Sequence, residues 1–350
     1  MDAYVLNQNF NTIGIVNSYS SLIWSERYFK AGEFELKTKI GSECDKLTAT
    51  DNYISVDGSD HIMIIESVES VSDDDDGFYL LKSGRSLESI LERRIVWQQT
   101  ILNTDLESAI YKLLYDNFMA GAATERQIPN FTMRRTGNFT QYQVEAQYTG
   151  DNIYDVICTL CESFGVGFKI TLESGQLVFS LYEGTDRSYA QSDNPYIVFS
   201  PSFDNLFNSN YYQSKKEYKN VALIAGEGEG LERKTATVGT MSGMSRRELY
   251  VDARDLSQNL QDEDTSTHVS DADYIKQLQQ RGTESLEEYK PIETFDGDID
   301  VTRLYHYKED FFLGDIVQVE SEQGATASSR IIEMTITEDN SGITYTPTFY

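Results

Sequence analysis

The first eighty residues alternate between hydrophobic and polar positions with a period of two, which is the pattern of β-strands. The alternation is clear in four runs: 4–10, 12–29, 32–40 and 61–70. Four consecutive aspartates, Asp73–Asp76, then precede Gly77. Their mutual repulsion and the freedom of glycine favour a solvated hairpin tip between two strands. Adjacent carboxylates alone do not supply the alternating ligands of a calcium loop.

The pattern changes in LKSGRSLESILERRIVW, residues 81–97. The segment begins like a strand, and Ser83-Gly84 predicts a turn. The next apolar residues recur at the spacing of one helical face, so an amphipathic helix is predicted from Leu87, Ile90, Leu91 and Ile95.

Two longer helices are predicted in the middle of the chain, at 106–119 and 152–164. Thr104 with Glu107 forms a capping box before the first helix, Asp151 can cap the second, and Gly165 ends it. Two strands then surround Ser174-Gly175, which predicts a hairpin. Two helices on a small sheet make a compact α+β module.

Strand patterns return from about residue 195, interrupted by one helix at 274–290 that Ser270 and Asp273 can cap. The predicted fold class is therefore mixed and β-rich, with two β-barrel-like domains that carry α+β and helical insertions. The expected domains are a first β-barrel over 1–100, an α+β insertion over 101–190, and a second β-barrel over 191–350. The second barrel carries a helical insertion at about 262–292.

Charge is the strongest global property of the chain, with 57 acidic residues against 29 basic ones and a formal net charge of -28. Such a surface repels nucleic acid and anionic membranes, because both are bound by clustered lysine and arginine. We therefore expect neither specific DNA binding nor a membrane partner. The start of the chain does not have the pattern of a signal peptide, so we expect synthesis in a cytoplasm.

Motifs for catalysis or metal binding are weak. Cys158 and Cys161 form a lone CxxC inside an apolar helical pattern, which favours packing over zinc or redox chemistry. His61, His268 and His306 are dispersed and fit neither HExxH nor a GxSxG-based triad. The Gly-rich stretch 226–230 carries glutamates that would repel phosphate. We predict no catalytic residue, no cofactor and no metal.

Several motifs, in this order, resemble the tail-hub proteins of siphophages, which are baseplate hubs or the N-terminal hub regions of tail-associated lysins. The motifs are WSERYFKAGEFEL, GRSLESILERRIVW, YIKQLQQRGTESLEEYK, FFLGDIVQVESE and SRIIEMTITEDNSGITYTPTFY. The resemblance implies a homotrimer in which each copy contributes two β-barrels to a ring of six. Such a ring would join a sixfold tail tube to a threefold tip and line the channel through which DNA leaves.

The partners that this resemblance implies are further copies of the chain, a distal tail protein or tail-tube hexamer, a separate tip fibre or spike protein, and the tape measure protein. The implied location is the tail tip of the virion, after assembly in a bacterial cytoplasm. The acidic charge would then let DNA pass without sticking. The chain stops just after its last predicted strand, so we expect any lysin or receptor-binding activity in a separate polypeptide.

The candidate interface residues come from two of these motifs: Trp24, Arg27, Tyr28, Arg93, Arg94 and Trp97. The adjacent arginines at 93 and 94 can form bidentate pairs with carboxylates of a neighbouring domain or subunit. Alternatively, they complement the dipole at the end of the predicted helix. Trp97 can pack against either neighbour.

Two other functions remain open from the sequence. A tail-tip hydrolase would need a cleft with paired carboxylates or a His/Cys site. A carbohydrate-binding receptor protein would use some of the 23 tyrosines as stacking faces. We predict a structural hub and no enzyme.

Overall fold

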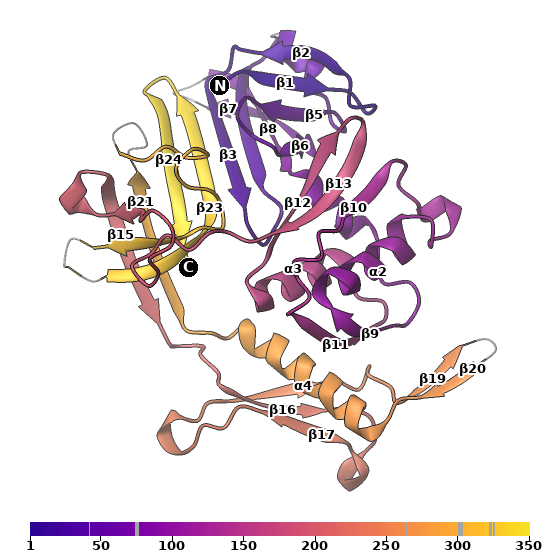
Figure 1. Ribbon diagram of the computed structural model, residues 1–350. Helices are drawn as coiled ribbons and strands as arrows, with labels where there is room; N and C mark the ends of the chain where they lie inside the picture. The colour runs from indigo at the N-terminus through magenta and orange to yellow at the C-terminus, as the bar shows by residue number, and fades with distance from the viewer. Residues whose placement is uncertain (42, 74–76, 263–264, 300–303, 322–323, 325) are drawn as a thin grey trace.

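The computed structural model describes residues 1–41, 43–73, 77–262, 265–299, 304–321, 324 and 326–350 (Figure 1). Its largest sheet has ten strands and draws on both ends of the chain. Eight of them follow one path: β15 (Leu206–Ser214), β21 (Ile292–Ile299), β24 (Gly342–Phe349), β23 (Thr326–Asp339), β3 (Ser21–Arg27), β4 (Glu33–Lys39), β8 (Gly77–Arg85) and β7 (Ser67–Asp73). Every neighbouring pair on this path is antiparallel.

The two β-rich regions meet where β3 pairs with β23, with Trp24 opposite Ile336. Two further strands, β22 (Ile316–Glu320) and β14 (Val198–Phe199), extend the sheet beside β23. The β-rich, multidomain fold class is therefore confirmed. The regions are not closed barrels, however: within the described residues no sheet closes on itself, and one open sheet runs through both.

A second sheet covers the first region, in the order β2-β1-β5-β6. Its strands are β1 (Ala3–Leu6), β2 (Thr12–Val16), β5 (Tyr53–Val56) and β6 (Ile62–Ile64), and the short helix α1 (Glu43–Leu47) lies between β4 and β5. The predicted hairpin between β7 and β8 is present, with Asp73 opposite Gly77. The aspartates at 74–76 lie outside the described residues.

The segment 81–97 differs from its prediction. Ser83 and Gly84 form no turn, because β8 continues to Arg85. The following helix is a 3-10 helix, η1 (Leu87–Arg93), and not an α-helix. Leu87, Ile90 and Leu91 are buried as expected, since a short 3-10 helix also places i and i+3 on one face, but Ile95 lies beyond it and is 39% exposed.

The middle region has the predicted α+β content. Its elements are β9 (Thr100–Asp105), α2 (Leu106–Phe118), η2 (Thr124–Arg126), β10 (Phe131–Arg134), β11 (Gln143–Tyr148), α3 (Ile153–Phe164), β12 (Gly167–Glu173) and β13 (Gln176–Tyr182). They form a three-stranded sheet, β10-β13-β12, and a pair, β11-β9. The hairpin at Ser174-Gly175 is confirmed, since Glu173 pairs with Gln176.

Two helix caps differ from the prediction by one residue. The N-cap of α2 is Asp105, whose carboxylate accepts from Ser108 N at 3.0 Å. Asn152, not Asp151, caps α3 by accepting from Tyr154 N at 2.9 Å. Gly165 ends α3 in the left-handed conformation with φ 68°, as predicted.

A smaller body below the main sheet has its own hydrophobic core (Figure 1). Its strands are β16 (Val221–Ala225), β17 (Thr235–Val238), β18 (Glu248–Asp252), β19 (Asn259–Asp262) and β20 (Thr265–His268), and helix α4 (Asp271–Glu287) packs on the β17-β16-β18 sheet. Ser270 caps α4 as predicted, since its hydroxyl accepts from Asp273 N. Single 3-10 turns occur at η3 (Pro201–Phe203), η4 (Gly230–Glu232) and η5 (Gly243–Ser245).

Among the described residues, no helix is both long enough and apolar enough to cross a membrane. The domain boundaries given above stay predictions.

Candidate functional site

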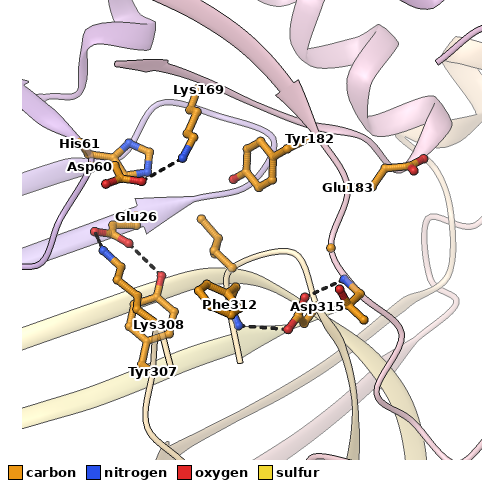
Figure 2. Close-up of a pocket in the computed structure, with 13 residues that line it drawn as sticks. Glu26, Asp60, His61, Lys169, Tyr182, Glu183, Tyr307, Lys308, Phe312 and Asp315 are labelled. Atoms are coloured by element: carbon orange, nitrogen blue, oxygen red, sulfur yellow. Dashed lines mark hydrogen bonds and ion pairs between the residues drawn. The ribbon is translucent and has the colours of Figure 1, made fainter. Parts of the chain in front are cut away.

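A cleft of about 450 Å³ lies where the first region, the middle region and the last region meet (Figure 2). It is lined by side chains from segments far apart in sequence, among them Glu26, His61, Lys169, Tyr182, Lys308 and Asp315. Burial of so many charged groups at one junction makes it the first candidate for chemistry.

Glu26, on β3, is 1% exposed and lies at the centre of a hydrogen-bond network. Its carboxylate accepts from Ser59 Oγ at 2.5 Å, and from Tyr307 Oη and Lys308 Nζ at 2.8 Å each. Lys308 Nζ also donates to the carbonyl oxygen of Gly58. Burial alone would raise the pKa of Glu26, but the charges of His61 and Lys308 outweigh it and lower this pKa to about 2.

His61 is buried between two carboxylates. Its Nδ1 lies 3.5 Å from Glu88 Oε1, which also accepts from Ile170 N at 2.7 Å. Burial lowers the pKa of His61, but the nearby charges of Glu88 and Glu26 reverse this effect and raise it above its usual value. The pKa of Glu88 is lowered, because the charge of His61 overcomes the effect of burial. Glu88 on η1 is thereby connected to the middle region.

Asp315 is the third buried carboxylate of the cleft, at 1% exposure. It accepts from Thr185 N at 2.6 Å, from Arg187 Nε at 2.7 Å and from Phe312 N at 3.1 Å. Two of these three donors follow β13, so Asp315 joins the end of the middle region to the last region.

Tyr28 closes the junction behind the cleft. Its ring is fully buried, and its hydroxyl lies 3.1 Å from the carbonyl oxygen of Gly165 and 3.2 Å from that of Tyr182. The same hydroxyl accepts from Gly184 N at 3.3 Å. This one side chain therefore holds three points of the middle region against β3.

Each carboxylate named in the cleft is held by a cation or by backbone N–H groups, and Asp60 at its rim pairs with Lys169 at 2.9 Å (Figure 2). Among the described residues, no group of His, Cys, Asp and Glu has a metal-holding arrangement. The cleft is therefore a network of ion pairs and hydrogen bonds around Glu26, His61, Glu88 and Asp315 that connects the three regions, and we call this network the electrostatic lock. It does not have the arrangement of two free carboxylates that acid–base catalysis needs.

The lock predicts a dependence of stability on pH. Glu26 has a folded pKa of about 2 against an ordinary value of 4.5, so its contribution is present above pH 4.5 and is lost as pH falls through about 2. His61 has a raised pKa, so its contribution is complete below about pH 6.5 and is lost as pH rises through the raised value. We expect the lock to be strongest between these limits.

From pH 4.5 to pH 2 the free energy of unfolding should fall by about 3 kcal/mol through Glu26 alone. Urea midpoints measured at half-unit pH steps test this. A Glu26→Gln variant should show a shallower acid limb. An equally steep limb in that variant would assign the acid sensitivity to other groups.

The candidate interface residues separate into two groups. Trp24 and Tyr28 are 0% exposed, so their side chains belong to the core and cannot form a contact surface. Both are large aromatic residues next to the β3–β23 seam, where the first and last regions bury each other. Arg27 pairs with Glu33 at 2.6 Å and with Glu333 at 2.5 Å, so it ties β3 to β23 within one chain.

The second group, Arg93, Arg94 and Trp97, is brought together on the surface in a groove of about 790 Å³. The groove also contains Arg126 and Asn117, which the sequence reasoning missed. Within the described residues, Arg93 and Arg94 form no ion pair, and the helix-dipole role does not describe them either. Arg94 Nε donates to the carbonyl oxygen of Arg126 at 3.0 Å, and η1 is too short to have a large dipole.

The cysteine pair is packed in the core as predicted. Cys158 and Cys161 are free and buried in α3, and burial raises the pKa of the Cys158 thiol to about 12. The Gly-rich stretch 226–230 connects β16 to β17 as a hairpin.

Three solved structures have the same arrangement over nearly their whole length. The tail protein from Neisseria meningitidis MC58 has a TM-score of 0.59 and 14% sequence identity, covering 99% of this chain and 95% of that one. The 43 kDa tail protein of prophage MuSo2 from Shewanella oneidensis has a TM-score of 0.60 and 12% identity, covering 100% and 98%. Prophage tail protein gp18 from Listeria monocytogenes EGD-e has a TM-score of 0.53 and 12% identity, covering 99% and 94%.

The fold is therefore that of phage tail proteins. No curated protein matches the sequence. The model of the Siphovirus ReqiPepy6 Gp37-like protein family matches residues 2–349, and the chain belongs to this siphovirus tail protein family.

Proposed function

We propose that this phage tail structural protein is a trimeric hub at the tail tip, where three copies form a ring around the DNA exit channel. The ring would connect the sixfold tail tube or distal tail ring to a threefold fibre or spike, with the tape measure protein as a further neighbour. The role is structural, and the charged cleft is a lock between regions of one chain.

The observation that carries this proposal is a duplicated strand order in the large sheet. Along the path, β15-β21-β24-β23 is followed by β3-β4-β8-β7. When the four strands of each half are numbered by their order in the chain, their order across the sheet is first, second, fourth, third in both halves. Along the path, each half begins with its first strand and ends with its third strand. The second half is therefore a repeat of the first, displaced sideways across the sheet.

The repeat predicts how copies would join. Inside the chain, the third strand of one half, β23, pairs with the first strand of the other half, β3. The two ends of the path are again a third strand, β7, and a first strand, β15, and each has one neighbour in the described sheet. Pairing β7 of one copy with β15 of the next would continue the antiparallel alternation and repeat the internal seam. Three copies would then carry six equivalent four-stranded units.

Exposure of the two edges supports this pairing. Val68 on β7 is 43% exposed, and the neighbouring strand β8 presents Phe78 at 71%. On β15, Tyr211 and Tyr212 are 41% and 51% exposed although they point to opposite faces. Edge strands with unpaired backbone groups and exposed hydrophobic side chains invite pairing with another chain, so an assembly that covers them would remove this liability.

The charge also fits a channel. With 57 acidic residues against 29 basic ones, the ring would repel DNA phosphates and let the genome slide past.

Light-scattering mass and electron-microscopy class averages test the ring. We expect about 119 kDa, three times the 39.8 kDa of one chain, and a threefold particle with an open centre. A protein that stays monomeric alongside its tail-tube neighbour would contradict the proposal.

Proline substitution tests the edge pairing itself. Ser70 and Val71 are consecutive in β7, so their N–H groups point to opposite sides, one toward β8 and one toward the free edge. Proline at the residue whose N–H bonds to β8 should destabilise the fold. Proline at the other of these two residues removes only an N–H at the free edge, so that variant should fold but should not form the ring. The first variant is the matched control for the second. If the folded variant still forms trimers, β7 is not the seam.

A further inference from the structure

The surface groove beside η1 is an accumulation of positive charge in an acidic chain. Arg93, Arg94 and Arg126 all line it, and within the described residues none of the three has a carboxylate within ion-pair distance. Elsewhere in the chain, arginines such as Arg27 and Arg187 are paired. An arginine cluster that forms no ion pair among the described residues, in a chain with 57 acidic residues, is an unbalanced site.

Backbone and aromatic contacts hold the guanidinium groups in place without neutralising them. Arg94 donates to the carbonyl oxygens of Arg93 and Arg126, at 2.8 Å and 3.0 Å. Arg126 Nη2 donates to the carbonyl oxygen of Ile95 at 2.9 Å and to Asn117 Oδ1 at 3.0 Å. Among the described residues, Arg94 Nη2 and the Nε and Nη1 of Arg126 have no hydrogen-bond acceptor, so these donors are available to a carboxylate.

Trp97 forms one side of the groove. Its ring is 66% exposed, and the guanidinium of Arg126 lies 5.0 Å from the ring centre. Partial burial and the neighbouring charge of Arg94 lower the pKa of Arg126. An exposed tryptophan beside preorganised arginines has the composition of a binding hot spot.

We propose that this groove binds a short, carboxylate-bearing segment of a different tail protein, with Arg93, Arg94 and Arg126 as the anion-binding groups and Trp97 as the aromatic contact. The groove is built from the end of η1 and the segment after it to Thr100, from α2, and from residues 121–126. None of its residues belongs to β7 or β15, the edges assigned to contacts between copies. The strand pairing proposed between copies therefore uses no residue of the groove. The inference does not depend on the ring and survives if the ring proposal fails.

Charge in and around the groove favours a carboxylate segment over nucleic acid. The groove includes Asp116, paired with Lys112 at 2.7 Å, and Glu125. These carboxylates and the net charge of -28 repel a long polyanion such as nucleic acid, which would extend over the acidic surface. A short segment can contact the arginines without extending beyond the groove. Gln98 and Gln99 at the rim add amide donors that suit a peptide backbone.

Fluorescence of the full-length protein provides a direct readout, because the chain has only two tryptophans and Trp24 is fully buried. Titration with a hexaglutamate peptide at low salt should change the Trp97 emission in a saturable way, and the change should vanish in Trp97→Phe. The response should weaken as salt is added.

Two charge-matched variants locate the binding. Arg93→Gln with Arg94→Gln should weaken peptide binding at least tenfold, since it removes two of the three charge-assisted contacts. Arg246→Gln with Arg254→Gln removes the same charge from exposed surface elsewhere and should leave binding within about twofold. Circular dichroism confirms that both variants are folded.

The alternatives give different results in the same assay. Absence of a Trp97 response to the peptide, or equal binding by both double variants, would overturn the proposal. A response to duplex DNA or inorganic phosphate but not to hexaglutamate would replace it with a phosphate site. Groove variants that fail to form the ring would show instead that another copy occupies the groove.

Discussion

Replacing Glu26 with alanine is expected to lower the free energy of unfolding by about 3 kcal/mol, near the lower limit for breaking a buried ion pair. The substitution removes the common acceptor of Ser59, Tyr307 and Lys308. Tyr307 is then left without its partner in the junction, while Lys308 is 30% exposed and recovers part of its hydration. This exposure places the expected loss at the lower limit.

Trp24 reports on this site during chemical denaturation, because its Nε1 donates to Ser59 Oγ at 3.3 Å. Glu309→Ala is a suitable control, since Glu309 is an exposed carboxylate next to Lys308 and its removal should change stability by less than about 0.5 kcal/mol. Lys308→Met combined with Glu26→Ala completes a double-mutant cycle. A coupling energy near zero would mean that Glu26 and Lys308 do not stabilise each other.

Regular elements were predictable from the sequence because local patterns determine them. The strands of the first region, α2, α3, α4 and the hairpin at Ser174-Gly175 all follow from periodicity and turn chemistry. The caps moved by one residue, because Thr104 and Asp105 are both good caps and tertiary contacts decide between them. Glu107, expected to complete a capping box, is buried and instead accepts from Thr136 N and Gly137 N.

The arrangement of the strands was not predictable in the same way. Pairing of β3 with β23 joins residues separated by about 300 positions, and nothing in a period-2 pattern says which strand lies beside which. Two β-barrel-like regions were predicted from strand content, but that content does not say that one open sheet runs through both. The duplicated strand order that supports the ring is visible only once the pairing is known.

The candidate sites also contain some residues that the sequence indicated and others that only the folded arrangement reveals. Arg93, Arg94 and Trp97 were identified because two arginines and a tryptophan are conspicuous in an acidic sequence. Arg126 joins them from another segment, and no spacing rule connects it to Arg94. Glu26, His61 and Glu88 were passed over because buried charge is a property of the folded chain, and their residue types are common on surfaces.

Gly84 shows why one sequence signal was misread. Ser83-Gly84 was predicted to turn, but Gly84 lies inside β8, and the backbone of residues 64–66 crosses directly over it. Glu66 N donates to the carbonyl oxygen of Ser83 at 3.0 Å at this crossing. Glycine is present because another backbone comes too close for any side chain, which is the second common meaning of glycine within a strand.

We therefore expect Gly84→Ala to destabilise the protein by about 3 kcal/mol or more, since a rigid backbone offers no room to relax. The added Cβ would overlap the carbonyl oxygen of Ile64 and lie 2.9 Å from Glu66 N. Gly14→Ala is the matched control. Gly14 is also a strand glycine, and the three atoms nearest to its added Cβ all belong to the side chain of Leu47, which can move aside.

Thermal and urea unfolding of the two variants measures the difference, and hydrogen exchange around Ile64–Glu66 locates it. Gly84→Ala should increase exchange at Glu66 N, because the strand crossing must open to admit the methyl group, while Gly14→Ala should leave that amide protected. If Gly84→Ala is as stable as Gly14→Ala, the crossing is looser than its geometry indicates, and the signal at Ser83-Gly84 then needs another explanation. If the predicted contrast is found, the strand glycine is explained by the chain that crosses it, a contact that local sequence does not encode.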